Sequence, residues 1–338
     1  MFHCASIYVP DIASAIQQDH GIAVALSTCA QAFDHHKREV HDSNIEAGAI
    51  ISLLHALDHV TRKIKVSQSP LGSTNEAKTL MIAAAAGMSG LEMIITRCSS
   101  EALEQCVRRN GNDLFPSLAS LLSIFAAGDN QSSVVRHLLL KNTSNSLNAV
   151  SRVSLAEIEI DLPAIKHCCT ALIGTLQCEG PGLVRSNCVS VLANLSRTDK
   201  VRDAMSTSTG LLDTLVFLIR PDDRRVDTVC ENALQAIYNL CHCTEGRASA
   251  IICSDNNVSN LLLGILSGTI EASDVAYAYC VRVIKCLASH PPNQKHLAKY
   301  RSIVPTLIAL AAKGPCSSDT KEAAIEAIVL LSRTAILV

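Results

Sequence analysis

Tryptophan is absent from this chain, aromatic residues make up only 3% of it, and neither sign of charge is in clear excess. The 29 Lys and Arg residues nearly balance the 31 Asp and Glu residues, and no long run of either sign occurs. These absences argue against a nucleic-acid-binding surface and a basic membrane-binding face, so we expect neither partner. Apolar residues make up 48% of the chain, so its core must be built mainly from Ala, Leu, Ile, Val and Cys.

Paired cysteine motifs are missing as well, although the chain has 15 cysteines and 12 histidines. The triplets Cys241-His242-Cys243 and His167-Cys168-Cys169 have no second ligand pair at a zinc-site spacing. Adjacent residues of a helix point about 100° apart, so one triplet cannot turn all its ligands toward one ion. We therefore predict no metal site and interpret the cysteines as reduced thiols in a helical core, which indicates a reducing compartment.

Motifs for catalysis or export are also missing. No GxSxG, HExxH, P-loop or GxGxxG pattern occurs, so we predict neither an enzyme nor a cofactor. The first twelve residues lack a basic segment followed by an apolar one, so we expect no signal peptide. The most membrane-like run is Thr79–Ile95, whose Ala and Gly content, with Ser89 and Glu92 inside, favours a buried helix and its turn.

What the chain does contain is a repeated helix. In Asp227–Thr244 the apolar residues fall at steps of three and four, which places them on one face of a helix. The segment Arg185–Arg197 has the same order of residues, with Asn194 lying 45 positions before Asn239. The helix is therefore one copy of a repeated unit.

A second signature lies between these copies, namely a Gly or Pro turn followed by a short apolar helix. Its seven copies align at Pro10, Ile51, Pro116, Pro163, Asp213, Ser259 and Pro305. The successive spacings are 41, 65, 47, 50, 46 and 46 residues, and all but the second are close to the length of helical solenoid repeats. The long spacing contains the polar segment Arg62–Asn75, with Pro70 and Gly72, which we interpret as an inserted loop over residues 62–75.

Each short apolar helix is followed by a polar linker and a longer helix. The predicted long helices are Gly21–Phe33, Asn75–Met88, Ser132–Leu147, Val184–Arg197, Asp227–His242, Val275–His290 and Asp319–Arg333. A further short helical piece usually follows, as at Asp199–Met205, so each repeat has three helices. This predicts an all-α protein in which residues 1–338 form a single solenoid, less regular over residues 77–155.

The motifs NLS at Asn194–Ser196, NLC at Asn239–Cys241 and EAGAIISLL at Glu46–Leu54 resemble armadillo repeats. The resemblance implies a right-handed α-α superhelix of about six full repeats plus a leading partial repeat. The chain begins at the second helix of a repeat and ends on the apolar tail Ala335–Val338. Because terminal repeats need a polar face, we expect either a piece of a longer array or ends that pack on another chain. The oligomeric state stays open.

The resemblance also implies a groove, lined by the long helices, in which Asn side chains hold the backbone of an extended peptide. An amide can do this because it offers both a donor and an acceptor. The candidates are Asn142, Ser190, Asn194, Glu231, Gln235, Asn239 and Arg282, in a polar strip that also includes His242 and Glu326. For Asn142 the register is open, because Asn145 competes with it. The alternative is that these Asn side chains cap turns or meet neighbouring helices.

Together these features predict a non-enzymatic intracellular adaptor or scaffold that binds an extended segment of a partner protein. Its location would be cytoplasmic, with the nucleus also open. Because no Trp is present to receive Lys stems, we do not expect recognition of basic import signals. The alternative function is regulation of a small GTPase, or a similar switch protein, through a folded-domain interface.

Overall fold

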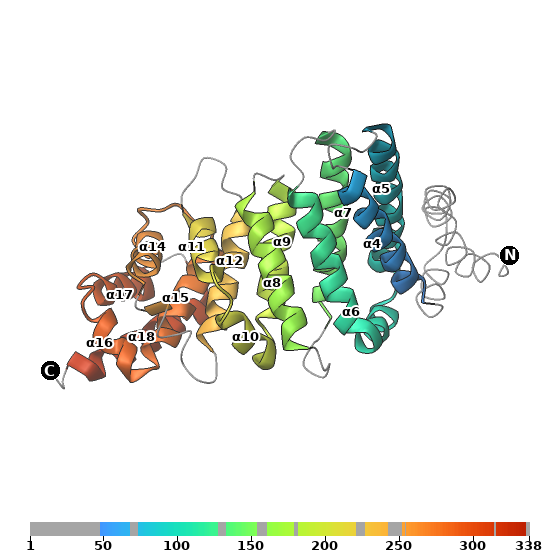
Figure 1. Ribbon diagram of the computed structural model, residues 1–338. Helices are drawn as coiled ribbons and strands as arrows, with labels where there is room; N and C mark the ends of the chain where they lie inside the picture. The colour runs from blue at the N-terminus through green and yellow to red at the C-terminus, as the bar shows by residue number, and fades with distance from the viewer. Residues whose placement is uncertain are drawn as a thin grey trace. The chain divides into compact units, whose positions relative to one another are not determined.

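The computed structural model describes residues 48–67, 74–127, 133–153, 161–178, 182–220, 227–242, 252–253, 255–313 and 316–335. In these ranges all regular secondary structure is α-helical. The helices are α4 (Ala49–Ser67), α5 (Thr74–Arg97), α6 (Ser100–Ala127), α7 (Ser133–Ser151), α8 (Leu162–Gln177), α9 (Gly182–Leu195), α10 (Asp199–Ser206), α11 (Leu211–Ile219), α12 (Asp227–Cys241), α14 (Asn256–Leu266), α15 (Asp274–Ala288), α16 (Pro291–Leu297), α17 (Ile303–Lys313) and α18 (Ser318–Ala335), labelled in Figure 1. The predicted leading repeat, with its helix Gly21–Phe33, lies outside the described residues.

The helices form two compact units, one up to Val191 and one from Leu192, with the boundary inside α9. In the first unit, α4, α6 and α8 pack in chain order as one layer, and α5 and α7 pack as a second. In the second unit, α11, α14 and α17 form one layer and α12, α15 and α18 the other. In the second unit the short apolar helices thus form one layer and the predicted long helices the other.

Burial of the apolar faces holds the layers together. On α12, Val229, Ala233, Ile237 and Leu240 are buried, as the periodicity predicts. Burying a side chain of this size contributes about 1.5–3 kcal/mol for Val, Leu or Ile. Cysteines share this core: Cys188, Cys230 and Cys280 have no exposed surface. Their predicted role as small apolar core residues is confirmed for these positions.

Glycine and proline mark the starts of several short helices. Gly48 and Gly210 precede α4 and α11 with φ angles of +78° and +79°, which an L residue with a side chain adopts only with strain. Pro163 lies in the first turn of α8, where its missing N–H has no helical acceptor. The predicted turns at these three sites are confirmed.

The predicted turn at Pro116 is wrong, because α6 runs from Ser100 to Ala127 as one helix of 28 residues with Pro116 inside it. A proline in a helix interior costs about 3 kcal/mol. Leu114, Phe115 and Leu118 around it are fully buried, and their packing offsets that cost. The first and second helices of this repeat are therefore fused.

Two further boundaries differ from the prediction. Helix α5 continues through Gly87, Ser89 and Gly90 to Arg97, beyond the predicted end at Met88. Helix α4 continues to Ser67 and α5 begins at Thr74, so only residues 68–73 of the predicted loop 62–75 lie outside the described helices. The polar residues in this stretch include Arg62, which forms an i, i+4 ion pair with Asp58 on α4. A polar composition alone was not evidence of a loop.

One described helical stretch, Leu80–Arg97 of α5, is long and apolar enough to cross a membrane by length and composition. Its mean hydropathy is 1.3, and 56% of it is buried within the protein. Met88, Leu91 and Ile94 are fully buried, and the helix packs against α4 and α7. Buried core helices also meet this criterion of length and apolar composition.

Candidate functional site

A groove of about 430 Å³ lies on the long-helix layer of the second unit, over α12, α15 and α18. Its lining consists of Tyr238 and His242 from α12; Arg282, Lys285 and Cys286 from α15, with Ser289 following it; and Asp319, Glu322, Ala323 and Glu326 from α18. The polar members of each group are spaced by three or four residues, which places them on one side of each helix. Because the opposite sides are buried in the core, these side chains face outward.

Two aromatic rings and two basic side chains form a connected series across α12 and α15. The ring of Tyr238 meets His242 edge to face at 4.8 Å and lies 6.2 Å from the ring of Tyr279. The guanidinium carbon of Arg282 lies 5.8 Å from the centre of the Tyr279 ring. Contacts of these types contribute about 0.5–1.5 kcal/mol each, so the series favours a defined arrangement of the groove floor.

The groove has unpaired carboxylates on one wall. Lys285 and Glu326 form an ion pair that joins α15 to α18, with side chains 40% and 47% exposed. Within the described residues, Asp319 and Glu322 form no ion pair. Burial lowers the pKa of His242, and the positive charges of Arg202, His290 and Lys285 lower it further. With His242 neutral at pH 7, the charges without an opposite partner are Arg282 on α15 and two carboxylates on α18.

Asn239 uses its side-chain amide inside the protein. Its Nδ2 donates hydrogen bonds to the carbonyl oxygen of Ala193 at 3.2 Å and to Oγ of Ser196 at 3.0 Å. Its backbone carbonyl accepts a hydrogen bond from Arg202 at 3.3 Å. The amide therefore joins α12 to the end of α9, which agrees with the alternative that such Asn side chains meet neighbouring helices. Any contact of Asn239 with a peptide stays a prediction.

Asn145, rather than Asn142, joins the polar contacts between the long helices of the first unit. Asn142 is only 4% exposed. Asn145 donates to Glu92 on α5 at 3.3 Å, and its Oδ1 accepts from Nδ2 of Asn187 on α9 at 2.6 Å. Asn187 was not singled out from the sequence. It has the same place in its copy of the repeat as Asn232, 45 residues later, and this match could have identified it.

The other predicted residues are distributed between structural contacts and the groove. Ser190, Asn194 and Gln235 are half-buried and do not line the groove. Glu231 accepts a hydrogen bond from Ser273, the residue that caps the start of α15. Arg282 lines the groove together with His242 and Glu326 of the predicted polar strip.

Four of the groove residues that the sequence did not indicate have side chains that can contact a ligand, namely Tyr238, Lys285, Asp319 and Glu322. The signal available for two of them was the spacing of Asp319, Glu322 and Glu326, which follows one helical face. This spacing also occurs on solvated helices, so it was not specific. The other two became identifiable once α12 and α15 were placed side by side.

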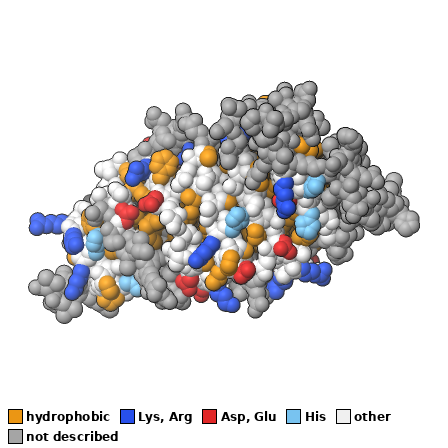
Figure 2. All heavy atoms as spheres, viewed as in Figure 1, with side chains coloured by type: hydrophobic (Ala, Val, Ile, Leu, Met, Phe, Trp, Pro, Cys, Tyr) orange, Lys and Arg blue, Asp and Glu red, His pale blue; other side chains and the backbone are white. Residues whose placement is uncertain are grey.

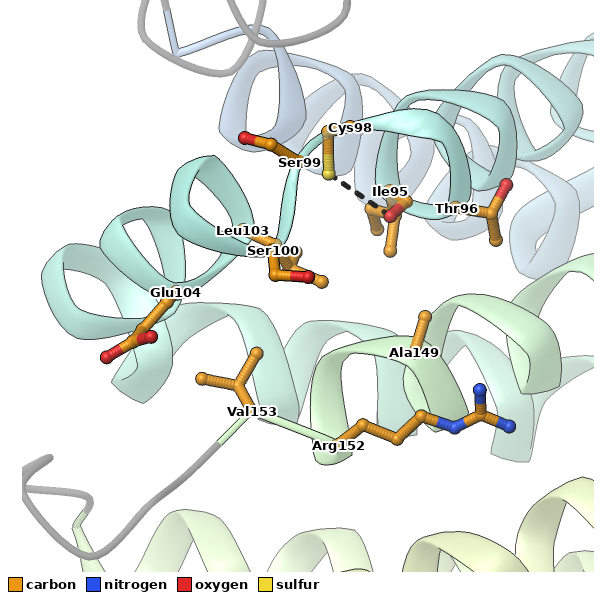
Figure 3. A pocket seen from close by; sticks show the side chains of 10 residues that line it. All are labelled: Ile95, Thr96, Cys98, Ser99, Ser100, Leu103, Glu104, Ala149, Arg152 and Val153. Atoms are coloured by element: carbon orange, nitrogen blue, oxygen red, sulfur yellow. Dashed lines mark hydrogen bonds between the residues drawn. The ribbon is translucent and has the colours of Figure 1, made fainter. Parts of the chain in front are cut away.

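A second cavity, of about 390 Å³, lies in the first unit where α5 and α7 end and α6 begins. Figure 3 shows Glu104 and Arg152 on opposite sides of it, with their charged ends pointing apart. Glu104 accepts two hydrogen bonds from Arg108, and Ser99 caps the start of α6 by accepting from Ala102 N. Its polar groups do not converge on a ligand position, so we take the groove of the second unit as the candidate site.

The part of the chain that the structure describes has neither a metal-binding cluster nor, on the face in view, a charged field of one sign. No group of three or more His, Cys, Asp and Glu there could hold a metal ion. On the face shown in Figure 2, basic, acidic and His side chains of the described residues are interspersed, without a field of one sign. Neither observation adds a ligand class to the groove.

No protein-family model and no curated protein matches the chain. Among solved structures, the chain is similar to a designed armadillo repeat protein, with 17% identity, a TM-score of 0.52 and coverage of 80% of this chain and 99% of that one. A second designed armadillo repeat protein, in complex with the peptide (KR)4, has 18% identity, a TM-score of 0.52 and coverage of 80% and 99%. An engineered protein has 19% identity, a TM-score of 0.54 and coverage of 81% and 96%. These likenesses, with the two-layer order of the helices, identify the fold of the chain as an armadillo-type α-solenoid.

Proposed function

We propose that the chain is a protein-binding scaffold, and that its groove on α12, α15 and α18 holds an extended segment of another protein through a basic side chain. The observation that carries the proposal is that two carboxylates without an ion-pair partner among the described residues, Asp319 and Glu322, line the same groove as the ring of Tyr238. The designed relative that was solved with (KR)4 supports a peptide ligand for a groove of this fold.

The chemistry of the groove suits a Lys or Arg side chain. The apolar stem of such a residue packs on an aromatic ring, while its charge stays in the solvated part of the groove. Asp319 and Glu322 lie one helical turn apart on α18, so one cation can interact with both. Because these carboxylates are exposed, each ion pair contributes only about 0.2–1 kcal/mol. A single groove contact of this kind gives weak binding, and a longer segment is needed for high affinity.

Arg282 limits the preference for basic ligands. It has a positive charge on α15, the helix that packs between α12 and α18, and its cation-π contact with Tyr279 leaves that charge in place. The groove is therefore expected to select for the position of a basic residue, with a neutral or acidic neighbour near Arg282. The proposal involves no catalytic step.

Fluorescence anisotropy with the full chain tests this function. The probes are labelled (Lys-Arg)4 and (Asp-Glu)4 peptides, compared at low and at physiological ionic strength because exposed ion pairs are screened by salt. The variant Asp319→Asn with Glu322→Gln should weaken (Lys-Arg)4 binding about fivefold, which corresponds to roughly 1 kcal/mol. The matched control, Asp213→Asn with Glu271→Gln, changes the net charge equally at exposed positions away from the groove. Equal weakening in both variants, or tighter binding of the acidic peptide, would refute the proposal.

A further inference from the structure

Two cysteines from neighbouring helices meet at the floor of the groove. Cys286 of α15 lines the groove and is 7% exposed, while Cys241 of α12 is fully buried. The Cys241 side chain lies near enough to Cys286 to influence its pKa as a hydrogen-bond partner. Helices α12 and α15 pack directly against one another, so the two sulfur atoms belong to adjacent repeats and neither is an isolated core thiol.

The surroundings of Cys286 differ from those of several other described cysteines. The hydrogen bond from Cys241 lowers its pKa, burial opposes this effect, and the positive charges of Arg202 and Lys285 lower the pKa further. By contrast, burial raises the pKa of Cys188 to about 12 and that of Cys253 to about 11. Burial also raises the pKa values of Cys106, Cys168 and Cys316, so Cys286 differs from each of these five thiols. A thiolate is the reactive form of cysteine, so Cys286 is favoured as a nucleophile.

We propose that Cys286 and Cys241 form an oxidation site, at which a small hydroperoxide entering the groove converts the two thiols into a disulfide. The groove admits a molecule as small as hydrogen peroxide to Cys286, whereas Cys241 has no exposed surface of its own. This assigns the reacting thiol as Cys286 and the resolving thiol as Cys241. The inference does not depend on the proposed peptide binding.

The chemistry takes two balanced steps. The Cys286 thiolate attacks one oxygen of hydrogen peroxide, the O–O bond breaks, and the products are a sulfenic acid on Cys286 and hydroxide. The sulfur of Cys241, which loses its proton to that hydroxide, then attacks the Cys286 sulfur, and the sulfenic oxygen leaves as water with a second proton from solvent. Two electrons pass from the two thiols to the peroxide, which supplies the oxidant. Overall, two thiols and hydrogen peroxide give one disulfide and two waters.

Mass spectrometry of the full chain tests this inference. The protein is treated with a small excess of hydrogen peroxide, alkylated and digested with trypsin without reduction. The expected product is the peptide Val226–Arg247 linked to the peptide Cys286–Lys295, with fragmentation placing the bond at Cys241. Before oxidation, the Cys286 thiol should react with iodoacetamide about tenfold or more faster than the Cys188 thiol.

Three serine variants separate the roles. Cys286→Ser should abolish the linked peptide, and Cys241→Ser should leave a sulfenic acid on Cys286 that dimedone traps. Cys243→Ser is the matched control, since Cys243 lies in the same tryptic peptide as Cys241, and it should retain the link. The inference fails if peroxide sufficient to oxidise the exposed Cys178 gives no linked peptide, if the bond maps to Cys230 or Cys243, or if dimedone does not label Cys286 in Cys241→Ser.

Discussion

Replacement of Asn187 by alanine is expected to destabilise the first unit by about 3–4 kcal/mol. Asn187 is 7% exposed and makes three side-chain hydrogen bonds to α7. These join it to Oγ of Ser144 at 3.1 Å, Oδ1 of Asn145 at 2.6 Å and Nδ2 of Asn148 at 3.1 Å. Each contributes about 0.5–1.5 kcal/mol net.

The variant also leaves a second residue unpaired. Asn148 is 8% exposed and its Oδ1 already has no hydrogen-bond partner. Loss of the Asn187 side chain would also leave Nδ2 of Asn148 without an acceptor. A buried unsatisfied group costs about 1–3 kcal/mol. The sum of these effects is a large fraction of the roughly 5–15 kcal/mol by which a typical domain is stable.

Hydrogen exchange of the α7 and α9 amides, together with urea unfolding, measures this effect. Ser190→Ala is the matched control, because Ser190 is on the same helix and half-buried, and its replacement should cost less than about 0.5 kcal/mol. A loss below about 1 kcal/mol in Asn187→Ala would show that the polar contacts between α7 and α9 do not hold the two helices together.

Three further outcomes are expected. Arg282→Gln should tighten the binding of (Lys-Arg)4 about two- to fivefold by removing a like charge, and unchanged or weaker anisotropy-derived affinity would count against the groove as the binding site. Because the pKa of His242 is below its usual 6.5 in the folded chain, the unfolded chain binds more protons as pH falls. Stability should therefore decrease on acidification through about pH 6.5, less so in His242→Gln; parallel pH profiles of the urea midpoint would contradict this. Pro116→Ala should raise the thermal midpoint, since the proline costs up to about 3 kcal/mol inside α6, and a lowered midpoint would mean that the proline shapes the packing of the helix.

The helices were predictable because they depend on one local pattern. The predicted long helix Asp227–His242 differs from α12 by a single residue at its end, since buried side chains at three- and four-residue steps identify a helical face without knowledge of its neighbours. Pro116 shows the limit of this method. Its local preference for a helix start was overridden by the burial of Leu114 and Phe115, which is a tertiary effect.

The groove was predictable only in part, because its residues are defined by contacts between helices. Arg282 was singled out from its place on a long helix, but the approach of Tyr238 to Tyr279 depends on how α12 and α15 pack. In the same way, the partners of Asn239 lie in the preceding repeat, and no spacing within α12 reveals them. In repeats of this kind, the residues of one helix are enough to predict that helix. A surface depends on several helices packed together.

Helix α10 contributes no residue to the groove. The buried side chain of Arg202, on α10, nevertheless affects the pKa of two groove residues. Arg202 is paired with Asp199 and bound to the carbonyl of Asn239, and its charge lowers the pKa of both His242 and Cys286. Arg202 acts on His242 after burial, and on Cys286 after the hydrogen bond with Cys241 and burial, so a displacement of α10 would shift both pKa values upward. One fixed cation thus contributes to the pKa of an imidazole and of a thiol, and movements of α10 would affect both groove side chains in the same direction.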